Sequence, residues 1–313
     1  MSQTKKVRVA LAGGRRHGTA CLKRLLDAGA TVCAVFGYAP SASEAEVDEP
    51  VGDLAKRHGI PYFDEPDLRK APAKKLLRDL APDVTLAVKW RRLFDAEGLA
   101  IPKHGTFVIH DSLLPHLRGA APLNWALILG EQHTGATLFR AVEAVDAGPV
   151  AGQVVVAIGA DDTAQVLEDK LVPVYADLAE KLVRGLAAGD LPLVPQDDSR
   201  ATFGTWRVPS DGVIDWQKPA RQVHDLVRAL APPWPGAATT LDGQPIVVTR
   251  TKVLADRDRW VGRVVGRVCE RYKGRGVAVL AGEGTVLVEE VVVDGKTLRA
   301  DDHVKSVKLT FGR

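Results

Sequence analysis

The first half of the chain alternates short apolar runs with amphipathic segments, and this alternation restricts the possible folds more than any other feature. The apolar runs have the length of strands that are buried on both faces, and the segments between them repeat apolar residues at helical spacing. Repeated strand–helix–strand units predict a parallel sheet with right-handed crossovers. The predicted strands are residues 7–13, 31–38, 83–90 and 105–110, and the predicted helices are residues 17–29, 49–59 and 71–81.

The pattern changes after a polar, turn-rich connector, PQDDSRATFG. A helical stretch over residues 163–189 precedes the connector, and Pro173 is expected to kink or split that helix. After the connector, a short helix that begins at Pro219 leads into β-type runs separated by Gly or Asp, which is typical of a small barrel. We therefore expect an α/β chain with a Rossmann-like parallel-sheet domain over residues 1–200 and a small β-rich, OB-like domain over residues 201–313.

Two residues carry acid–base chemistry at places where an open parallel sheet binds ligands. His110 ends the last predicted strand, so it is expected to face the crevice at the carboxyl edge of the sheet, with Val108 on the same face. Asp146 follows another apolar run, ATLFRAV, in a Gly-containing turn. An acid held near a His can orient the imidazole and relay protons. Taken singly, a strand-end His and a turn Asp are more often structural.

The segment HDSLLPHLRGAAPLNWALILGEQHTGATLFRAVEAVDAGPV resembles the formyltransferase superfamily that uses 10-formyltetrahydrofolate. The shared pattern looks like N-x-H-x-S-L-L-P-x-x-R-G, then a Trp-containing helix, then G-x-T and D-x-G. The resemblance covers nearly the whole chain, and the region after the connector is most similar to formyltransferases that act on amino-sugars. The residues that supply the pattern are His110, Ser112, Leu114, Pro115, Arg118, Trp125, Gly135, Thr137, Asp146 and Gly148.

The resemblance implies an enzyme in which the amine of a small acceptor attacks the formyl carbon of the folate, which is the donor cofactor. His110 is then expected to stabilise the oxyanion, and Asp146 is expected to move protons. Backbone in two loops, Trp90–Leu93 and Ala141–Asp146, is expected to grip the pterin. The residues implied as binding it are Trp90, Arg91, Leu93, Ala141, Val142 and Asp146, and those of the active-site loop are Ser112, Leu114, Pro115 and Arg118.

The sequence departs from the family pattern at Val108, which occupies the position of the family's oxyanion-binding Asn. Valine has no donor, and losing one such donor typically costs about 10²–10³ in rate. Asn124 is one candidate replacement. Asp111 is expected to point to the other face if the strand continues. In a turn its carboxylate would instead approach His110, raise the pKa of the imidazole and favour a permanently protonated His110.

Val108 leaves several activities open. The preferred interpretation is formyl transfer to an amino-sugar or a natural-product intermediate. The superfamily also contains a formyl-folate hydrolase domain that resembles this chain in having an apolar residue at the Asn position, where water replaces the amine. A non-catalytic folate-binding protein and a tRNA-directed formyltransferase are the remaining alternatives.

Nucleic acid is disfavoured as a partner. The initiator-tRNA formyltransferases resemble this chain throughout, but their basic loop corresponds here to the acidic stretch SASEAEVDEP. Its four acids would repel phosphate, and a net charge of +3 over 313 residues is ordinary for a globular protein. The four acids are Glu44, Glu46, Asp48 and Glu49.

The sequence gives little support for a nucleotide cofactor, a metal ion, secretion or membrane insertion. The first turn, AGGRRHG, fits neither G-x-G-x-x-G nor a P-loop. His104, His110 and His116 are spaced by six, which suits no metal site, so no metal is expected. The apolar run of the N-terminal segment is too short for a signal-peptide core or a membrane span. Three cysteines without a CxxC motif suggest free thiols in the cytoplasm. Exposed strand edges in the β-rich part would allow a homodimer.

Overall fold

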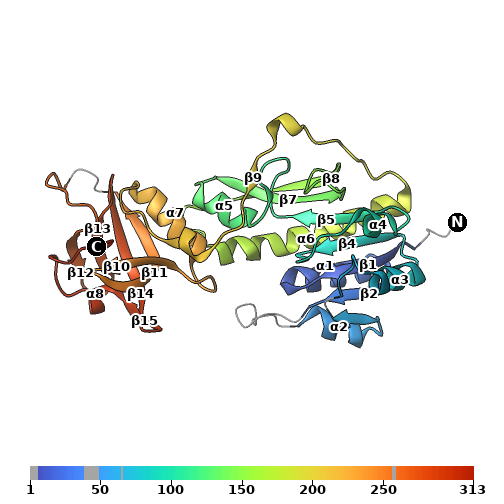
Figure 1. The fold of residues 1–313 in the computed structure, drawn as a ribbon, viewed down its shortest axis with the longest axis horizontal. Coiled ribbons are helices and arrows are strands. Elements are labelled where there is room, and N and C mark those ends of the chain that lie inside the picture. Colours follow the sequence, from blue (N-terminus) through green and yellow to red (C-terminus); the bar gives the residue numbers. More distant parts are fainter. Residues whose placement is uncertain (1–5, 39–48, 65, 256–258) are drawn as a thin grey trace. The chain divides into compact units, whose positions relative to one another are not determined.

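The computed structural model describes residues 6–38, 49–64, 66–255 and 259–313, which form two compact units (Figure 1). The first unit contains the residues up to Pro122, His133–Ala157 and Glu168–Thr205. The second contains Leu123–Gln132, Ile158–Leu167 and Trp206–Arg313. The chain therefore changes unit for the last time after Thr205, and two short earlier segments also belong to the second unit.

A seven-stranded sheet forms the centre of the described part of the first unit, in the order β3-β2-β1-β4-β5-β7-β8. Neighbours from β3 to β5 are parallel, whereas β7 and β8 are antiparallel. The strands are β1 (Arg8–Gly13), β2 (Thr31–Gly37), β3 (Tyr62–Asp64), β4 (Val84–Val88), β5 (Thr106–His110), β7 (His133–Arg140) and β8 (Val150–Ala157). The helices that lie wholly in this unit are α1 (Arg15–Asp27), α2 (Val51–Arg57), α3 (Ala71–Leu80) and α4 (Ala96–Ala100). Helix α5 (Pro122–Ile128) belongs to the second unit from Leu123 on, and helix α6 (Ala164–Ala188) belongs to the first unit from Glu168 on.

The central strands read as continuous apolar runs because helices and loops cover both of their faces. All five residues of β4 are buried, as are the last five of β1. On one face, Ala73 and Leu77 of α3 join a cluster of small side chains on the sheet that includes Ala12 and Ala87. The small residues let the helix approach the strands closely, so the sheet is held at a fixed distance from α3.

The registers place the ends of three strands at one edge of the sheet. Gly13 of β1 pairs with Val88 of β4, and Val88 pairs with Ile109 of β5. Strand β7 runs the other way, so that Arg140, its last residue, pairs with Phe107 near the start of β5. The chain after β7 therefore begins at the amino end of β5 and has to return along it before it can approach His110.

The second unit is built on an antiparallel sheet in the order β10-β11-β14-β13-β12, with β15 paired to β14. Single bridges from Phe311 to Leu241 and from Thr310 to Arg267 link the two ends of this sheet through one segment. Helix α7 (Ala220–Leu230) packs Val223 and Val227 into the core of the unit. The strands and the last helix are β10 (Ala237–Leu241), β11 (Gln244–Leu254), β12 (Val268–Tyr272), β13 (Gly276–Leu280), β14 (Thr285–Val293), β15 (Lys296–Arg299) and α8 (Ala300–His303).

The predicted fold class, a Rossmann-like parallel sheet followed by a β-rich domain, is confirmed. The antiparallel strands β7 and β8 extend the parallel part at one edge. Pro173 does not split α6, which runs without a break from Ala164 to Ala188. Pro173 is exposed, and the buried Leu171 and Tyr175 on either side of it pack the helix against the first unit, so one missing backbone hydrogen bond is tolerated.

We expect Leu77→Ala to lower the free energy of unfolding by about 2–5 kcal/mol, because it removes a fully buried side chain from the α3–sheet contact and leaves a cavity. Lys75→Ala, on the exposed side of the same helix, should change it by no more than about 0.5 kcal/mol. Calorimetric unfolding of both variants measures the difference. Equal effects would contradict the packing described for α3.

Candidate functional site

His110 ends β5 with its side chain on the half-exposed face of the strand. Phe107 and Ile109 are buried, whereas Val108 and His110 are half-buried, as the two-residue repeat of a strand requires. Val108 therefore lies on the same face as His110, and it packs at the edge of the cluster that α3 covers. The side chain at the position of the family's Asn thus offers no hydrogen-bond donor on this face.

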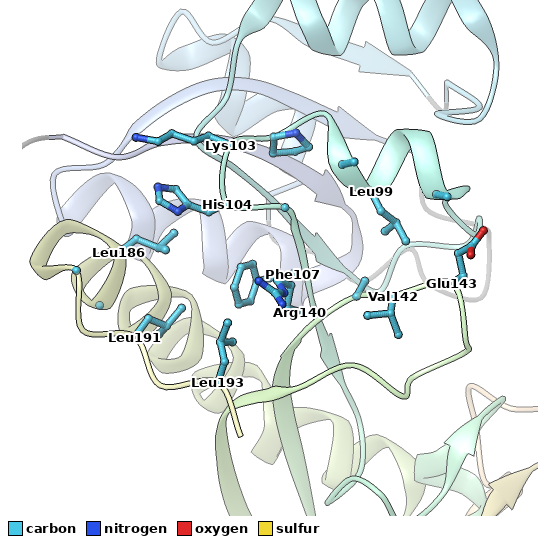
Figure 2. Close-up of a pocket in the computed structure, with 17 residues that line it drawn as sticks. Leu99, Lys103, His104, Phe107, Arg140, Val142, Glu143, Leu186, Leu191 and Leu193 are labelled. Carbon is cyan, nitrogen blue, oxygen red and sulfur yellow. The ribbon is translucent and has the colours of Figure 1, made fainter. Parts of the chain in front are cut away.

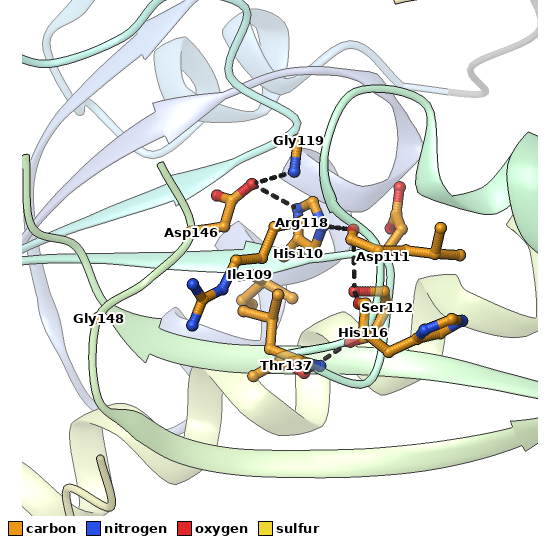
Figure 3. A network of polar contacts seen from close by, with 12 residues as sticks. Ile109, His110, Asp111, Ser112, His116, Arg118, Gly119, Thr137, Asp146 and Gly148 are labelled. Atoms are coloured by element: carbon orange, nitrogen blue, oxygen red, sulfur yellow. Dashed lines mark hydrogen bonds and ion pairs between the residues drawn. The ribbon is translucent and has the colours of Figure 1, made fainter. Parts of the chain in front are cut away.

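The imidazole of His110 lies between a backbone carbonyl and a carboxylate (Figure 3). Nε2 is 2.8 Å from the carbonyl oxygen of Leu117, and because a carbonyl only accepts, Nε2 carries a proton. Nδ1 faces Oδ2 of Asp146 at 3.7 Å, which is too long for a direct hydrogen bond. The two side chains are only 10% and 15% exposed, so the imidazole–carboxylate pair is sheltered from bulk water.

Asp146 is held in place by the backbone around it. The N–H of Gly119 donates to Oδ2, the same oxygen that faces His110, over 2.8 Å. Asp146 itself has a φ of 52°, in the left-handed region that Asn and Asp tolerate better than most residues. Gln196 donates to the main-chain oxygen of Asp146 over 2.8 Å, and no sequence motif had pointed to this glutamine.

The loop that carries Ser112, Leu114 and Pro115 is braced from within and by β7. Ser112 Oγ donates to the carbonyl of His116 over 2.6 Å, so this hydroxyl is a loop brace. Thr137 Oγ1 donates to the carbonyl of Ser112 over 2.6 Å and accepts from the N–H of Leu114 over 3.1 Å. The Leu114–Pro115 peptide bond is cis. These contacts fix the path of the loop to Leu117, which holds the imidazole.

Arg118 is buried, and its guanidinium is engaged by side chains of the segment that follows α6. Its side chain is 5% exposed, and its guanidinium donates to Gln196 Oε1 over 2.8 and 3.1 Å and to Asp198 Oδ1 over 2.7 Å. Arg118 thus joins the active-site loop to the segment that follows α6.

The residues predicted to grip the pterin differ in their surroundings. Leu93 is 65% exposed and Val142 is 41% exposed, which is unusual for large apolar side chains. The indole Nε1 of Trp90 is buried and has no hydrogen-bond partner among the residues that the structure describes, and the ring lies 6.3 Å from that of Tyr38. Arg91 stacks its guanidinium 3.9 Å above Tyr38. Leu93 and Val142 therefore offer apolar surface to a ligand, while Trp90 and Arg91 pack toward the end of β2.

A groove of about 650 Å³ opens at the amino end of β5, away from His110 (Figure 2). Gly105 and Phe107 line it together with Leu99 of α4 and Arg140. Ala141 and Val142 belong to its lining, whereas His110, Asp146 and the Trp90–Leu93 loop do not. The groove reaches one predicted folate loop but not the imidazole–carboxylate pair, so it is not the place where the chemistry would occur.

Asp111 follows His110, but its carboxylate turns to the other side of the sheet. It forms an ion pair with Lys89 and accepts a hydrogen bond from the hydroxyl of Tyr175. Lys89 Nζ also lies 3.1 Å from Glu168 Oε1. Of the two expectations for Asp111, the placement on the opposite face is therefore the one that the structure shows, as for consecutive side chains of a strand, and the turn that would bring its carboxylate to His110 does not occur.

The charges in this network support one another. Burial opposes ionisation of Asp111, but Lys89 outweighs it and holds the pKa of that carboxyl below its usual value. Burial likewise opposes the ammonium of Lys89, but Asp111 and Glu168 hold its pKa above the usual value. Nearby His17 is 1% exposed, and burial lowers its pKa well below the ordinary range, so it is neutral at pH 7.

Three further expectations concern residues away from this network. Asn124, the candidate replacement for the missing Asn, donates from Nδ2 to the carbonyl of Ala229 over 2.7 Å, and both residues belong to the second unit. Among the described residues, no group of three or more His, Cys, Asp or Glu side chains is arranged to hold a metal ion. No helix in the described ranges has the length and apolarity needed to cross a membrane.

Comparison with known proteins connects both units to one family. The profile described as formyl transferase matches residues 5–177, more than half of the chain, and the profile described as formyl transferase, C-terminal domain, matches residues 208–308.

Solved structures share the fold at low sequence identity. HypX from Aquifex aeolicus in complex with tetrahydrofolic acid is 18% identical, with a TM-score of 0.63, over 97% of this chain and 48% of that chain. The N-formyltransferase from Helicobacter canadensis, in complex with folinic acid and dTDP-3-aminofucose, is 13% identical, with a TM-score of 0.68, over 90% and 98%. A sugar N-formyltransferase from Shewanella sp. is 16% identical, with a TM-score of 0.62, over 78% and 97%. This chain thus spans about half the length of HypX.

We expect Asp111→Asn to lower the free energy of unfolding at pH 7 by about 3–5 kcal/mol, because it leaves the buried Lys89 with one carboxylate fewer. The folded-state pKa of Asp111 is depressed, so its contribution is present above the ordinary Asp range and is lost as the pH falls below about 4. The gap between variant and parent should therefore narrow in acid. Asp53→Asn, which removes the carboxylate of the exposed Asp53–Lys56 pair, is the control. A difference in the free energy of unfolding between Asp111→Asn and the parent that stays constant from pH 7 to pH 3 would contradict the pairing of Asp111 with Lys89.

Proposed function

The chain belongs to the formyl transferase family, and on that premise we propose that it transfers a formyl group from 10-formyltetrahydrofolate to the amine of a small acceptor, an amino-sugar or a natural-product intermediate. The observation that carries the proposal is the sheltered pair of His110 and Asp146 at the carboxyl end of β5, with Nδ1 and Oδ2 3.7 Å apart. A proton can be exchanged there without competition from bulk water.

In the proposed reaction the acceptor amine attacks the formyl carbon, and the carbonyl electron pair moves to oxygen. Nδ1 of His110 takes the proton that the new C–N bond makes acidic, because Nε2 is committed to Leu117. Asp146 stabilises the imidazolium, whose charge also favours the nearby oxyanion. The oxyanion then collapses, the bond from the formyl carbon to N10 of the folate breaks, and His110 returns the proton to N10.

The donor is proposed to lie with its pterin against Leu93 and Val142, whose exposed apolar surface it would cover. Ala141 and the backbone as far as Asp146 would line the same side, which brings N10 toward His110. Two relatives are consistent with this donor: the HypX structure holds tetrahydrofolic acid, and the Helicobacter canadensis structure holds folinic acid.

A small acceptor is proposed because the Helicobacter canadensis structure contains a dTDP-amino-sugar and the Shewanella protein is a sugar N-formyltransferase. The acidic stretch that disfavours a tRNA acceptor lies outside the described residues except for its end. Glu49 is described, and it pairs with Arg57 over 2.7 Å and with Lys23 over 3.3 Å.

Hydrolysis of the formyl-folate is the second candidate, and Val108 favours it. The half-buried valine beside His110 leaves the oxyanion without a side-chain amide, as the resemblance to the hydrolase domain implies. Water would then occupy the place of the amine, and His110 would take its proton in the same way.

The deciding experiment mixes the purified protein with 10-formyltetrahydrofolate and follows tetrahydrofolate release with and without dTDP-linked amino-sugars and simpler amines. Release that depends on the amine, with formyl recovered on it, is the expected result. Release at the same rate without any amine would replace transfer by hydrolysis. Folate binding without release under either condition would overturn both.

We expect Asp146→Asn to lower kcat by about 10²–10⁴ at pH 7, because the imidazolium loses its counter-charge while the hydrogen bond from Gly119 can persist. Folate affinity, measured by quenching of protein fluorescence, should stay within about threefold. Asp190→Asn, an exposed residue of the same unit, is the control. Turnover in Asp146→Asn equal to that of the control would remove Asp146 from the chemistry.

We expect Val108→Asn to raise kcat, with roughly 10²-fold as the ceiling, because it supplies the amide donor that this chain lacks. Val108→Ala separates that gain from the change in volume, since it offers space without a donor. Steady-state rates with saturating folate and acceptor provide the comparison. A rate that is unchanged or lower in Val108→Asn would mean that the site is organised around valine.

A further inference from the structure

We propose that Gln196 is a positioning residue that sets the distance between Asp146 and His110. The proposal rests on the function proposed above and adds to it a side chain that touches neither folate nor acceptor in the mechanism. Gln196 lies in the segment that follows α6, here called the strap (residues 194–204). Its amide makes four hydrogen bonds, and all of them end on the loops that carry the candidate site.

The nitrogen of the Gln196 side chain anchors the Asp146 loop. Nε2 donates one hydrogen to the carbonyl of Asp146 over 2.8 Å and the other to the carbonyl of Gly148 over 2.7 Å. Both donors are thereby used, and the two carbonyls flank the turn that presents the carboxylate. Asp146 has a positive φ, a conformation that needs support from its surroundings.

The oxygen of the same side chain anchors the opposite loop. Oε1 accepts from Nε and Nη2 of Arg118 over 3.1 and 2.8 Å, and Arg118 is only 4% exposed. The next residue, Gly119, donates its N–H to Oδ2 of Asp146. A closed ring of contacts therefore runs from Gln196 to Arg118 and Gly119, across to the carboxylate of Asp146, and back through its carbonyl to Gln196.

The rest of the strap supports the His110 side of the pair. Thr202 accepts from the N–H of Leu117 through its hydroxyl over 2.8 Å, and Leu117 is the residue whose carbonyl holds Nε2 of His110. Val194 exchanges two backbone hydrogen bonds with Val150, just beyond the Asp146 loop. One segment, distant in sequence from both catalytic candidates, thus holds the partner of each.

The separation of His110 and Asp146 depends on these contacts because Nδ1 and Oδ2 are 3.7 Å apart and share no direct hydrogen bond. Nothing between the two side chains therefore corrects a shift of the loop. A displacement of about 1 Å at a reacting group can lower a rate by roughly 10²-fold. Gln196 contacts both loops and is therefore placed to prevent that displacement.

Gln196→Glu tests the anchoring with little change in volume. The glutamate keeps an oxygen for Arg118 but replaces both donors to Asp146 and Gly148 by an acceptor, so the Arg118 contact persists while the Asp146 loop is released. We expect kcat with saturating folate and acceptor to fall by about 10–100-fold, while KM for the acceptor stays within about threefold. Gln217→Glu, an exposed residue of the second unit, controls for the added charge.

A double-mutant cycle distinguishes positioning from a general loss of structure. If Gln196 acts through Asp146, then Gln196→Glu should cost less than about threefold when it is introduced into Asp146→Asn. Equal losses in the two backgrounds, or a kcat in Gln196→Glu within threefold of that in Gln217→Glu, would overturn the proposal.

Hydrogen exchange keeps this test separate from the test of function. The amides of residues 141–150 should exchange faster in Gln196→Glu than in Gln217→Glu, whether or not the protein turns over formyl-folate. If these amides exchange faster in Gln196→Glu but the parent protein does not turn over formyl-folate, the proposed function is overturned and the anchoring stands. Unchanged exchange would overturn the anchoring even if the parent protein is active.

Discussion

The buried ion pair of Lys89 and Asp111 holds together the edge of the sheet on which the candidate site is built. Lys89 follows β4 and Asp111 follows β5, so their attraction joins two strand ends where the parallel ladder stops. Burying two charges is unfavourable unless further hydrogen bonds satisfy them, and Tyr175 and Glu168 of α6 do so. The long helix is thereby docked against the strand ends. With Asp111 held on one face, the side chain of His110 is directed to the other, where Asp146 approaches.

Much of the fold could be predicted because the spacing of apolar residues along a short segment is enough to tell a strand from a helix. The apolar runs of β1, β2 and β4 are buried as continuous stretches apart from the first residues of β1 and β2, and the alternation along β5 places His110 and Val108 together. The direction of β7 could not be predicted in this way, because its apolar pattern is the same for a parallel and an antiparallel strand. The contacts of Arg118 with Gln196 and of Lys89 with Glu168 could not be predicted from the sequence either. They join residues that are distant in sequence, and only the tertiary path of the chain brings them together.

Val108 gives the imidazole–carboxylate pair a larger share of the proposed chemistry. With an amide at that position, an oxyanion would have a neutral donor in addition to the charge on His110. Without it, the stabilisation depends on an imidazolium whose own stability comes from Asp146. The accuracy with which the loops hold these two side chains then matters more than it would in a site with a third group. The dense bracing by Gly119, Thr137 and Leu117 is consistent with such a demand.

The close approach of Gly119 to Gly204 has a consequence for how this protein can diversify. Gly119 has a φ of 92°, and a methyl group on its Cα would lie 2.7 Å from the carbonyl oxygen of Gly204. Substitution of Gly119 by any other residue is therefore disfavoured. The apolar groups on the neighbouring loops, Leu93, Val142 and Val145, are 65%, 41% and 48% exposed and meet no such barrier. Lineages that acquire new ligand preferences are expected to differ at those three positions, while residue 119 stays glycine.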